Sequence, residues 1–437
     1  MRKFWIPLGI IALILYLYAV YTGTSAYWAG KKIFSDSNGS SPYFSYGSPS
    51  PKQLSEEGDG RINILLLGIG GANHPGGLLT DTIMVASIDP VNKKVALLSI
   101  PRDLYTPIYG DAKNKINYAH AYGEQYKKNE GGGPVISKKT VSWLLDLPIH
   151  YYIRADFTGF TDLIDTLGGV DVYVEKAIND PYYPDAKMIG YEPFSISAGQ
   201  HHLDGKTALK YARSRETTSD FDRARRQQQI LQALKDKATS TGIVANPKKW
   251  NLIIQVLGNH LKTDLSLKET EQLIAMLKDI KSEDITAQVL DNTSSGLLTS
   301  SSGQAGYYLV PKDGTYQSIR IFTHTLLIDP YLQQEGAKIS LVNATGKSDY
   351  EKKIALFLQS YGYNIVEQSS GKTEKTTTIY DYTGGKDPYT IEFLKNRFQA
   401  KVVPSNDKSK GVDIEIQIGQ NYLKLIQDSE KMANTQN

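Results

Sequence analysis

Short stretches with an apolar pattern typical of strands or helices follow one another through the first half of the chain. Apolar runs of strand length occupy residues 62–67, 82–88, 95–100, 150–153 and 170–174. Apolar residues at helical spacing occupy 118–126, 137–145 and 156–167, and Asp156 is a candidate cap of the last of these helices. Strands that alternate with helices indicate a layered α/β domain, which we expect to be built around a central mixed β-sheet.

Helical periodicity dominates the middle of the chain. Apolar positions such as Ile230 repeat at helical spacing within residues 220–238, and two further helical patterns cover 250–261 and 267–281. Residues 292–306 are rich in Ser, Gly and Thr, and this composition predicts a loop.

A second, smaller unit begins near Lys338. Strands are predicted at residues 338–342, 363–366, 377–380, 401–403 and 413–418, with helices at 349–361 and 388–398. The unit has about 85 residues, within the usual size range of a domain. We expect a small α/β domain, and its sequence contains no convincing catalytic constellation.

The N-terminal segment carries a long apolar run. Arg2 and Lys3 precede residues 4–21, which are almost entirely apolar, and about 17–25 such residues span a bilayer. A signal peptide is the rival interpretation, but Ala26 and Ala29 have the wrong spacing for its cleavage site. We therefore expect one uncleaved transmembrane helix, with the N-terminus in the cytoplasm and the bulk of the chain outside.

These patterns predict a simple order of parts along the chain. They are a cytoplasmic stub (1–3), a transmembrane anchor (4–22), a flexible linker (23–60), a main α/β domain with a helical extension (61–335), the small C-terminal domain (336–422) and a polar tail (423–437).

Composition excludes several kinds of chemistry. The 437 residues include no cysteine, which excludes disulfides, zinc–thiolate sites and a cysteine nucleophile. The formal net charge is +3, and a dedicated nucleic-acid-binding protein usually has a much larger basic excess. The sequence also lacks the Gly-x-Ser-x-Gly and His-Glu-x-x-His motifs of serine hydrolases and zinc proteases.

Acidic and basic side chains lie at the ends of two predicted strands. Asp81 stands at the head of one strand, and Arg102 and Asp103 stand at the end of the next. If the two strands pair antiparallel, these ends are neighbours, and two carboxylates at an open site suit magnesium. A structural Asp–Arg pair remains an equal alternative. Lys115 follows in a polar loop, where a solvated lysine is the default interpretation.

A glycine-rich segment follows the first predicted strand, at residues 68–71 and 76–77. It lacks both the Gly-Lys-Ser/Thr ending of a phosphate-binding P-loop and the spacing of a dinucleotide-binding fingerprint. An ordinary loop is therefore the favoured interpretation.

The strongest candidate site is a cluster of arginines at the start of the helix predicted at 220–238. Its members are Arg213, Arg215, Asp220, Arg223, Arg225, Arg226 and Gln227. A helical wheel puts Arg223, Arg226 and Gln227 on the apolar side and points Arg225 away. Charges on a buried face are costly unless they are paired or face a ligand. Arginines at a helix N-terminus suit a phosphate or pyrophosphate anion, and the alternative is a solvated basic helix start.

In order along the chain, these residues resemble the LytR–CpsA–Psr (LCP) family of bacterial cell-wall enzymes. The matching segments are 63–68, 80–84, 99–103, 115–117, 159–172, 203–209, 211–215 and 220–227. Together they cover residues 61 to about 240, and residues 338–422 are similar to the LytR C-terminal domain. One position departs from the family pattern, because Gly70 stands where an aspartate is usual.

The resemblance implies a membrane-anchored phosphotransferase. Such enzymes move a glycopolymer from an undecaprenyl-pyrophosphate carrier in the cytoplasmic membrane onto peptidoglycan, and they form a phosphodiester bond. A polyprenyl-pyrophosphate hydrolase and a non-catalytic, lipid-binding envelope or regulatory protein are the alternatives. None of these functions involves nucleic acid.

The resemblance also assigns roles to individual residues. It implies that Asp81 and Asp103 hold Mg2+ and that Asp103, Arg102 and Asp220 are catalytic, with Asp103 or Asp220 deprotonating the acceptor hydroxyl. The residues implied to bind pyrophosphate are Arg102, Lys115, Arg213, Arg215, Arg223, Arg226 and Gln227. Phe157, Phe160, Leu163 and Leu167 either line a groove for the prenyl chain or belong to the core, and the core is favoured for each of them.

Overall fold

A computed structural model describes most of the chain between residues 49 and 425. The described residues are 49–50, 52–54, 56–72, 74–185, 189–214, 220–240, 253, 255–303, 306–405, 407 and 410–425. The expected anchor, most of the linker, the segment with Arg215 and the end of the tail lie outside these residues. Within the described ranges, no helix is both long enough and apolar enough to span a membrane.

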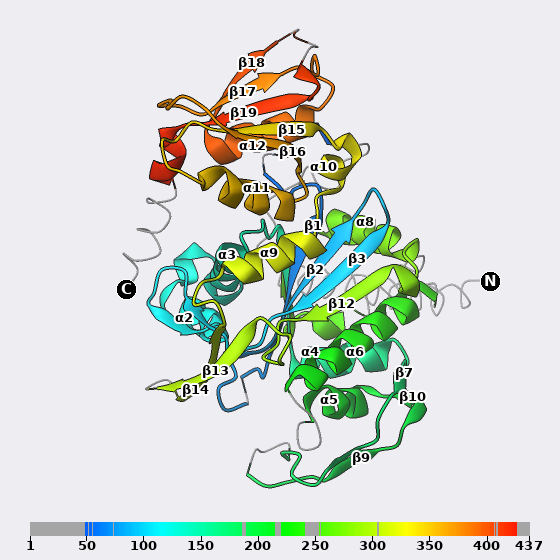
Figure 1. Cartoon of the computed structure of the whole chain (residues 1–437). Helices are drawn as coiled ribbons and strands as arrows, with labels where there is room; N and C mark the ends of the chain where they lie inside the picture. The colour runs from blue at the N-terminus through cyan, green and yellow to red at the C-terminus, as the bar shows by residue number, and fades with distance from the viewer. Residues whose placement is uncertain are drawn as a thin grey trace, which may run out of the picture. The chain divides into compact units, whose positions relative to one another are not determined.

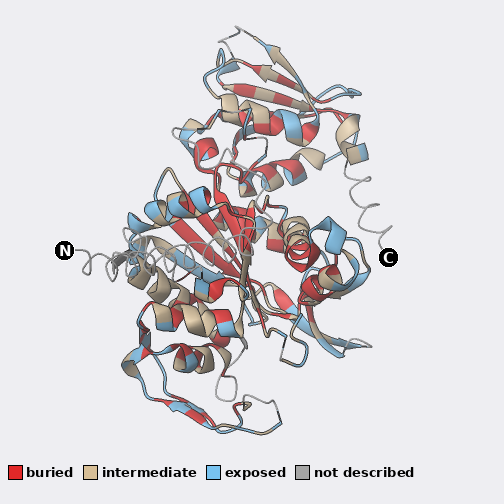
Figure 2. Ribbon diagram, turned by 180° about the vertical axis from the view of Figure 1, so that it is seen from behind, coloured by how far each residue is buried: buried red, intermediate tan, exposed pale blue. Residues whose placement is uncertain are grey.

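A mixed six-stranded sheet runs through the main domain, as the sequence predicts (Figure 1). Its order is β11 (Leu261–Thr263), β6 (Tyr151–Asp156), β1 (Ile62–Ile69), β2 (Thr80–Asp89), β3 (Lys94–Ser99) and β12 (Ile285–Val289). β2 pairs antiparallel with β3, whereas β12 pairs parallel with β3. Most residues of β1, β2 and β3 are buried (Figure 2), because their apolar runs carry side chains to both faces.

The described chain divides into two compact units. Within the described ranges, the first unit covers residues 67–78 and 152–278, and the second covers 49–66, 79–151 and the chain from 279 onward.

The first unit combines helices and short strands around its own apolar core. Its elements are α4 (Phe157–Thr166), β7 (Val170–Val174), β8 (Ile178–Asp180), β9 (Phe194–Ile196), β10 (Gly199–Leu203), α5 (Gly205–Arg213), α6 (Asp220–Ser240), β11 and α8 (Leu267–Lys278). Asp156 caps α4 as predicted, since its side chain accepts from the backbone N–H of Gly159. The core joins Ile164, Val172, Tyr211 and Ile230, so α6 is fixed by the apolar positions that its sequence predicts.

The second unit contains the β2–β3 hairpin, β12 and several helices. The other elements of its first part are β4 (Tyr105–Pro107), β5 (Lys113–Lys115), α2 (Tyr118–Tyr126), α3 (Gly132–Leu145), β13 (Leu298–Gly303), β14 (Gly306–Pro311), α9 (Gln317–Leu326) and α10 (Pro330–Glu335). The prediction of a loop at 292–306 is wrong in part, because residues 298–303 form a strand paired with β14. Serine and threonine there face solvent along an exposed hairpin, so no apolar alternation marks the strand.

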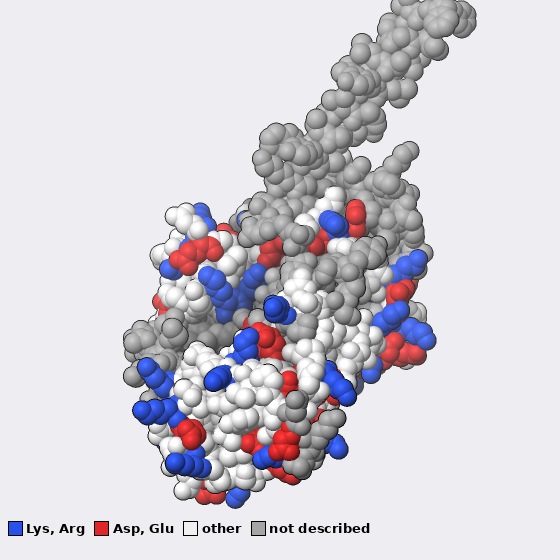
Figure 3. Space-filling model, turned by 90° about the horizontal axis from the view of Figure 1, so that it is seen from above, with Lys and Arg blue, Asp and Glu red and all other residues white. Residues whose placement is uncertain are grey.

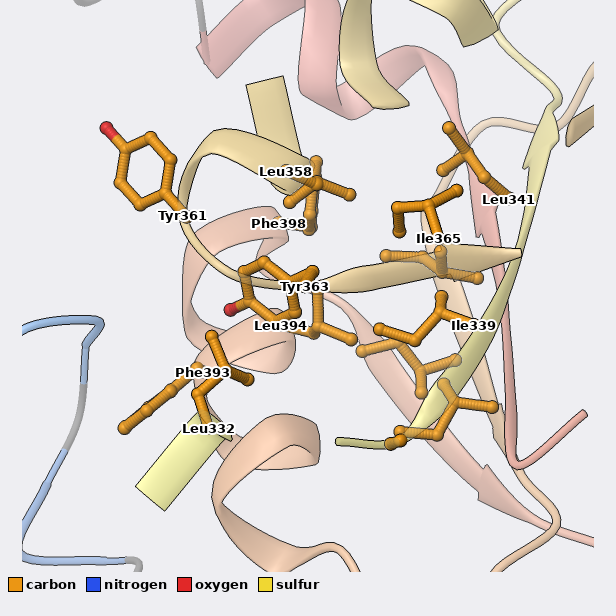
Figure 4. Close-up of a cluster of buried hydrophobic side chains, with 14 of the residues drawn as sticks. Leu332, Ile339, Leu341, Leu358, Tyr361, Tyr363, Ile365, Phe393, Leu394 and Phe398 are labelled. Atoms are coloured by element: carbon orange, nitrogen blue, oxygen red, sulfur yellow. The ribbon is translucent and has the colours of Figure 1, made fainter. Parts of the chain in front are cut away.

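The C-terminal part of the second unit has a sheet of its own. Its strand order is β16 (Asn364–Ser370), β15 (Lys338–Asn343), β19 (Ile414–Ile418), β17 (Thr378–Asp381) and β18 (Lys401–Pro404). Helices α11 (Tyr350–Ser360) and α12 (Pro388–Phe398) cover it, and Leu358, Phe393 and Phe398 are fully buried against the strands (Figure 4). The predicted small α/β architecture is therefore present.

Charges of both signs mix on the surface. On the face shown in Figure 3, Lys and Arg side chains lie among Asp and Glu side chains rather than in one continuous basic area. This distribution agrees with the small net charge of +3.

Candidate functional site

Four charged side chains of the second unit form one connected network. The guanidinium of Arg102 donates to Asp81 and also lies 3.4 Å from Asp103 Oδ2. Lys115 Nζ donates to the other oxygen, Asp103 Oδ1, at 3.0 Å. We call Asp81, Arg102, Asp103 and Lys115 the Asp81–Lys115 network.

Antiparallel pairing brings this network together. Met84 of β2 lies opposite Ser99 of β3, so the start of β2 adjoins the end of β3, as the sequence suggests. The chain then returns past the same place, because Asn117 N–H donates to Arg102 O at 3.2 Å and Thr80 N–H donates to Asn117 O at 3.3 Å. These backbone bonds hold the segment of Lys115 beside the two aspartates.

The network contains two carboxylates of the kind that bind magnesium, but these do not form a complete set of protein ligands for the ion. Within the described ranges, no three His, Cys, Asp or Glu side chains come together as a metal site. Asp81 and Asp103 nevertheless share one guanidinium and are partly exposed, at 29% and 15%. Magnesium usually takes one or two carboxylates and fills its remaining positions with water and substrate phosphates. The two aspartates therefore fit such an ion, and magnesium stays a prediction.

The arginines of α6 point as the helical wheel predicts. Arg223 and Arg226 are buried, with 7% and 6% of their surface exposed. Arg225 faces solvent and pairs with Asp222 at 3.2 Å. Gln227 lies on the inner side and donates from Nε2 to the Ala212 carbonyl at 3.3 Å.

The structure gives Arg226 a structural task that sequence reasoning missed. Its Nε donates to Tyr211 O at 2.8 Å, and its Nη2 donates to Ser214 O. The last carbonyls of a helix have no hydrogen-bond donors within that helix. Here Arg226 of α6 donates to two carbonyls at the end of α5. Burial lowers the pKa of Arg226, and its two hydrogen bonds link α6 to the end of α5.

Arg213 has a different environment, made of three rings. Its guanidinium lies over Phe157 at 4.2 Å and near the Tyr183 ring at 5.6 Å. Nη1 donates to Tyr183 Oη at 3.3 Å, and Nη2 lies 3.3 Å from His74 Nε2. Burial raises the pKa of Tyr183, so this phenol is uncharged near pH 7. We call Phe157, Tyr183 and His74 the Arg213 cage.

The cage holds a positive charge without neutralising it. Among the described residues, the polar partners of Arg213 are Tyr183 and His74, and no carboxylate forms an ion pair with it. Aromatic faces attract a cation and fix its plane, while leaving its donors available to an anion. This arrangement can bind a phosphate or carboxylate group that arrives from solution.

The predicted site residues are thus placed in two groups, one in each unit. Arg213, Arg223, Arg226 and Gln227 gather where α5 meets α6. Asp81, Arg102, Asp103 and Lys115 form the network described above. Arg215 lies outside the described residues, and only the backbone of Asp220, at the start of α6, is described.

Two cage residues, His74 and Tyr183, were missed from sequence. Each lies in a connecting segment, 139 and 30 residues before Arg213, and neither carries a motif. The only signal was Gly70, the departure from the family pattern, because its lack of a side chain leaves room for the His74 ring. Phe157, which the sequence predicts as a groove or core residue, is the third member of the Arg213 cage.

Comparisons with known protein families match both parts of the chain. The model of the LytR_cpsA_psr family matches residues 26–320. The model described as LytR cell envelope-related transcriptional attenuator matches residues 336–422.

Two relatives are named as teichoic acid transferases. The polyisoprenyl-teichoic acid–peptidoglycan teichoic acid transferase TagT of Bacillus subtilis is 30% identical over 286 residues, which are 64% of this chain and 84% of TagT. The transferase TagU of Oceanobacillus iheyensis is 37% identical over 224 residues, 51% of this chain and 64% of TagU. A solved structure titled TagT bound to LIIa-WTA is 27% identical with a TM-score of 0.49, covering 66% of this chain and 97% of that one.

Proposed function

Because this chain belongs to the LytR–CpsA–Psr family, we propose that it is a phosphotransferase of the cell envelope. It moves a glycopolymer from an undecaprenyl-pyrophosphate carrier onto a hydroxyl of peptidoglycan and forms a phosphodiester bond. The names of TagT and TagU, which describe teichoic acid transfer to peptidoglycan, support this class of reaction.

The Arg213 cage is the observation that carries the proposal. Phosphoryl transfer depends on positioning and charge neutralisation more than on a covalent nucleophile. A guanidinium held by three rings, with no acidic partner among the described residues, keeps its full charge for a pyrophosphate. Arg223 is proposed to bind the same group, as are Arg215 and Gln227.

The Asp81–Lys115 network is proposed to act in the same reaction. Arg102 and Lys115 would bind phosphate oxygens, and Asp81 and Asp103 would hold Mg2+, which would neutralise phosphate charge when bound. Asp103 or Asp220 would take the proton of the acceptor hydroxyl. The Arg102 guanidinium and the Lys115 ammonium lie 3.4 and 3.0 Å from the two oxygens of Asp103, so they would fix the position of this carboxylate in the proposed site.

The proposed reaction needs access to a lipid carrier. We propose that residues 4–22 anchor the chain in the cytoplasmic membrane by a single span, with the N-terminus inside and both folded parts outside. Peptidoglycan lies on that side, so the anchored chain would meet donor and acceptor together.

The direct test is transfer by the full chain in detergent micelles, with a labelled polyprenyl-pyrophosphate saccharide, magnesium and peptidoglycan. Arg213→Ala is expected to lower transfer by at least about a hundredfold, the usual effect of losing one transition-state donor. Arg225→Ala is the matched control, because it removes an exposed arginine of the neighbouring helix, and it should keep wild-type activity. Equal losses in both variants, or none in Arg213→Ala, would contradict the proposed role.

A further inference from the structure

The loop after β1 brings a histidine side chain back over the strand end. Gly71 N–H donates to Gly77 O at 3.1 Å, and Gly77 N–H donates to His74 O at 2.8 Å. Gly71 adopts a φ of +88°, a left-handed conformation that favours glycine. The loop closes so tightly that a Cβ atom at Gly70 would lie 2.6 Å from His74 Cγ.

The contacts of His74 define its protonation state in the free protein. Nδ1 lies 2.8 Å from Pro75 O, an atom that only accepts, so Nδ1 carries the hydrogen. Nε2 lies 3.3 Å from Arg213 Nη2, a group that only donates. The imidazole is therefore neutral, with the lone pair of Nε2 facing the guanidinium, and its ring lies edge-on to Phe157 at 5.3 Å.

We propose that His74 takes up a proton when a phosphate anion binds to Arg213 and then donates a second hydrogen bond to that anion. Histidine is the side chain that changes charge most readily near neutral pH. An anion between the two side chains accepts from both, so the lone pair that faced Arg213 is replaced by an Nε2–H group. The proton comes from solvent. This inference rests on the proposed role of Arg213 in pyrophosphate binding.

Several charged or titratable groups of the described chain lie around the loop. Arg213 faces His74 from the end of α5, and the phenol of Tyr183 stays neutral near pH 7. Asp156 lies at the base of the loop, with its Cβ 3.2 Å from the Cβ position of Gly71, and it pairs with His260 at 2.9 Å. His260 is thus a second imidazole nearby, and a control must separate its titration from that of His74.

The test is calorimetric binding of inorganic pyrophosphate, without metal, to the full chain in detergent at pH 6 and pH 8. The wild type is compared with His74→Gln, whose amide oxygen still accepts from Arg213 but takes up no proton. The ratio of wild-type to variant affinity should be about tenfold larger at pH 6 than at pH 8, the size of one charge-assisted hydrogen bond. Using this ratio cancels the titration of pyrophosphate itself.

Proton uptake gives an independent readout. Binding heats measured at pH 7 in two buffers of different ionisation enthalpy should show uptake by the wild type and by His260→Gln, but reduced uptake by His74→Gln. An affinity ratio that is the same at both pH values, with equal proton uptake, would overturn the role of His74 while leaving the proposed function intact. Absence of pyrophosphate binding by the wild type, or binding unaffected by Arg213→Ala, would overturn both.

Discussion

Two arginines close to the end of α5 show how one side chain type serves two purposes. Arg226 is buried and gives its hydrogens to the carbonyls of Tyr211 and Ser214. Arg213 lies on aromatic faces and has neutral partners, Tyr183 and His74. We therefore expect loss of Arg226 to reduce stability and loss of Arg213 to reduce binding.

Arg226→Ala should lower the free energy of unfolding by about 2–3 kcal/mol, because two carbonyls lose hydrogen bonds from a charged donor in a buried place. Arg213→Ala should change it by less than about 1 kcal/mol, since Arg213 forms no ion pair and no hydrogen bond to a backbone group within the described part of the chain. Urea denaturation followed by circular dichroism measures both. Similar losses in the two variants would show that the division of roles is wrong.

Gly70→Ala tests the packing that places His74. An added Cβ would meet the His74 ring at 2.6 Å, so the ring must leave Arg213. We expect the pH dependence of pyrophosphate affinity to fall to that of His74→Gln, with the protein still folded, because Gly70 does not need a left-handed backbone. Wild-type pH dependence in this variant would contradict the assigned position of His74.

At the scale of elements, the periodicity of apolar residues predicted most of the helices and strands. The pattern in 220–238 correctly separated buried Arg223 and Arg226 from exposed Arg225, because helix geometry alone sets that division. The pairing of β2 with β3 was equally predictable, since a short turn joins two apolar runs. Long-range partners were not predictable: Tyr183 and His74 reach Arg213 through segments without periodic pattern.

Helix α9 contains a buried histidine whose charge state should couple stability to pH. His324 Nε2 donates to Asp146 O at 2.7 Å, and its ring stacks on Tyr361 at 3.6 Å. Burial lowers the pKa of His324 to about 4. The unfolded chain, with a histidine pKa near 6.5, therefore binds this proton first as the pH falls.

The sign follows from linkage: the stabilising contribution of neutral His324 is present above pH 6.5 and is lost as the pH falls towards 4. Between pH 7 and pH 4.5, the wild type should lose about 2–3 kcal/mol relative to His324→Gln. Buried Asp329, whose pKa burial raises to about 6, acts in the opposite direction but is common to both proteins. Urea denaturation at the two pH values measures this difference, and an unchanged difference would refute the coupling.

At the scale of the whole molecule, the segment that leads from the linker is joined to the C-terminal sheet domain. Arg397 of α12 donates to both oxygens of Glu57, at 2.6 and 2.8 Å. Burial alone would lower the pKa of Arg397, and the carboxylate of Glu57 raises it instead. Such a bidentate pair is among the stronger polar contacts in proteins, so this domain is tied to the chain that enters the main fold.

The most direct test of the account is the chemical nature of the product. The full chain is incubated with a polyprenyl-pyrophosphate saccharide labelled in its sugar, with magnesium and peptidoglycan, and the digested wall is analysed by mass spectrometry and phosphorus NMR. We predict a saccharide joined to peptidoglycan through a phosphodiester, formed by the wild type and Arg225→Ala but not by Arg213→Ala. Release of free saccharide phosphate with no wall conjugate would show hydrolysis instead, and lipid binding without any product would contradict catalysis.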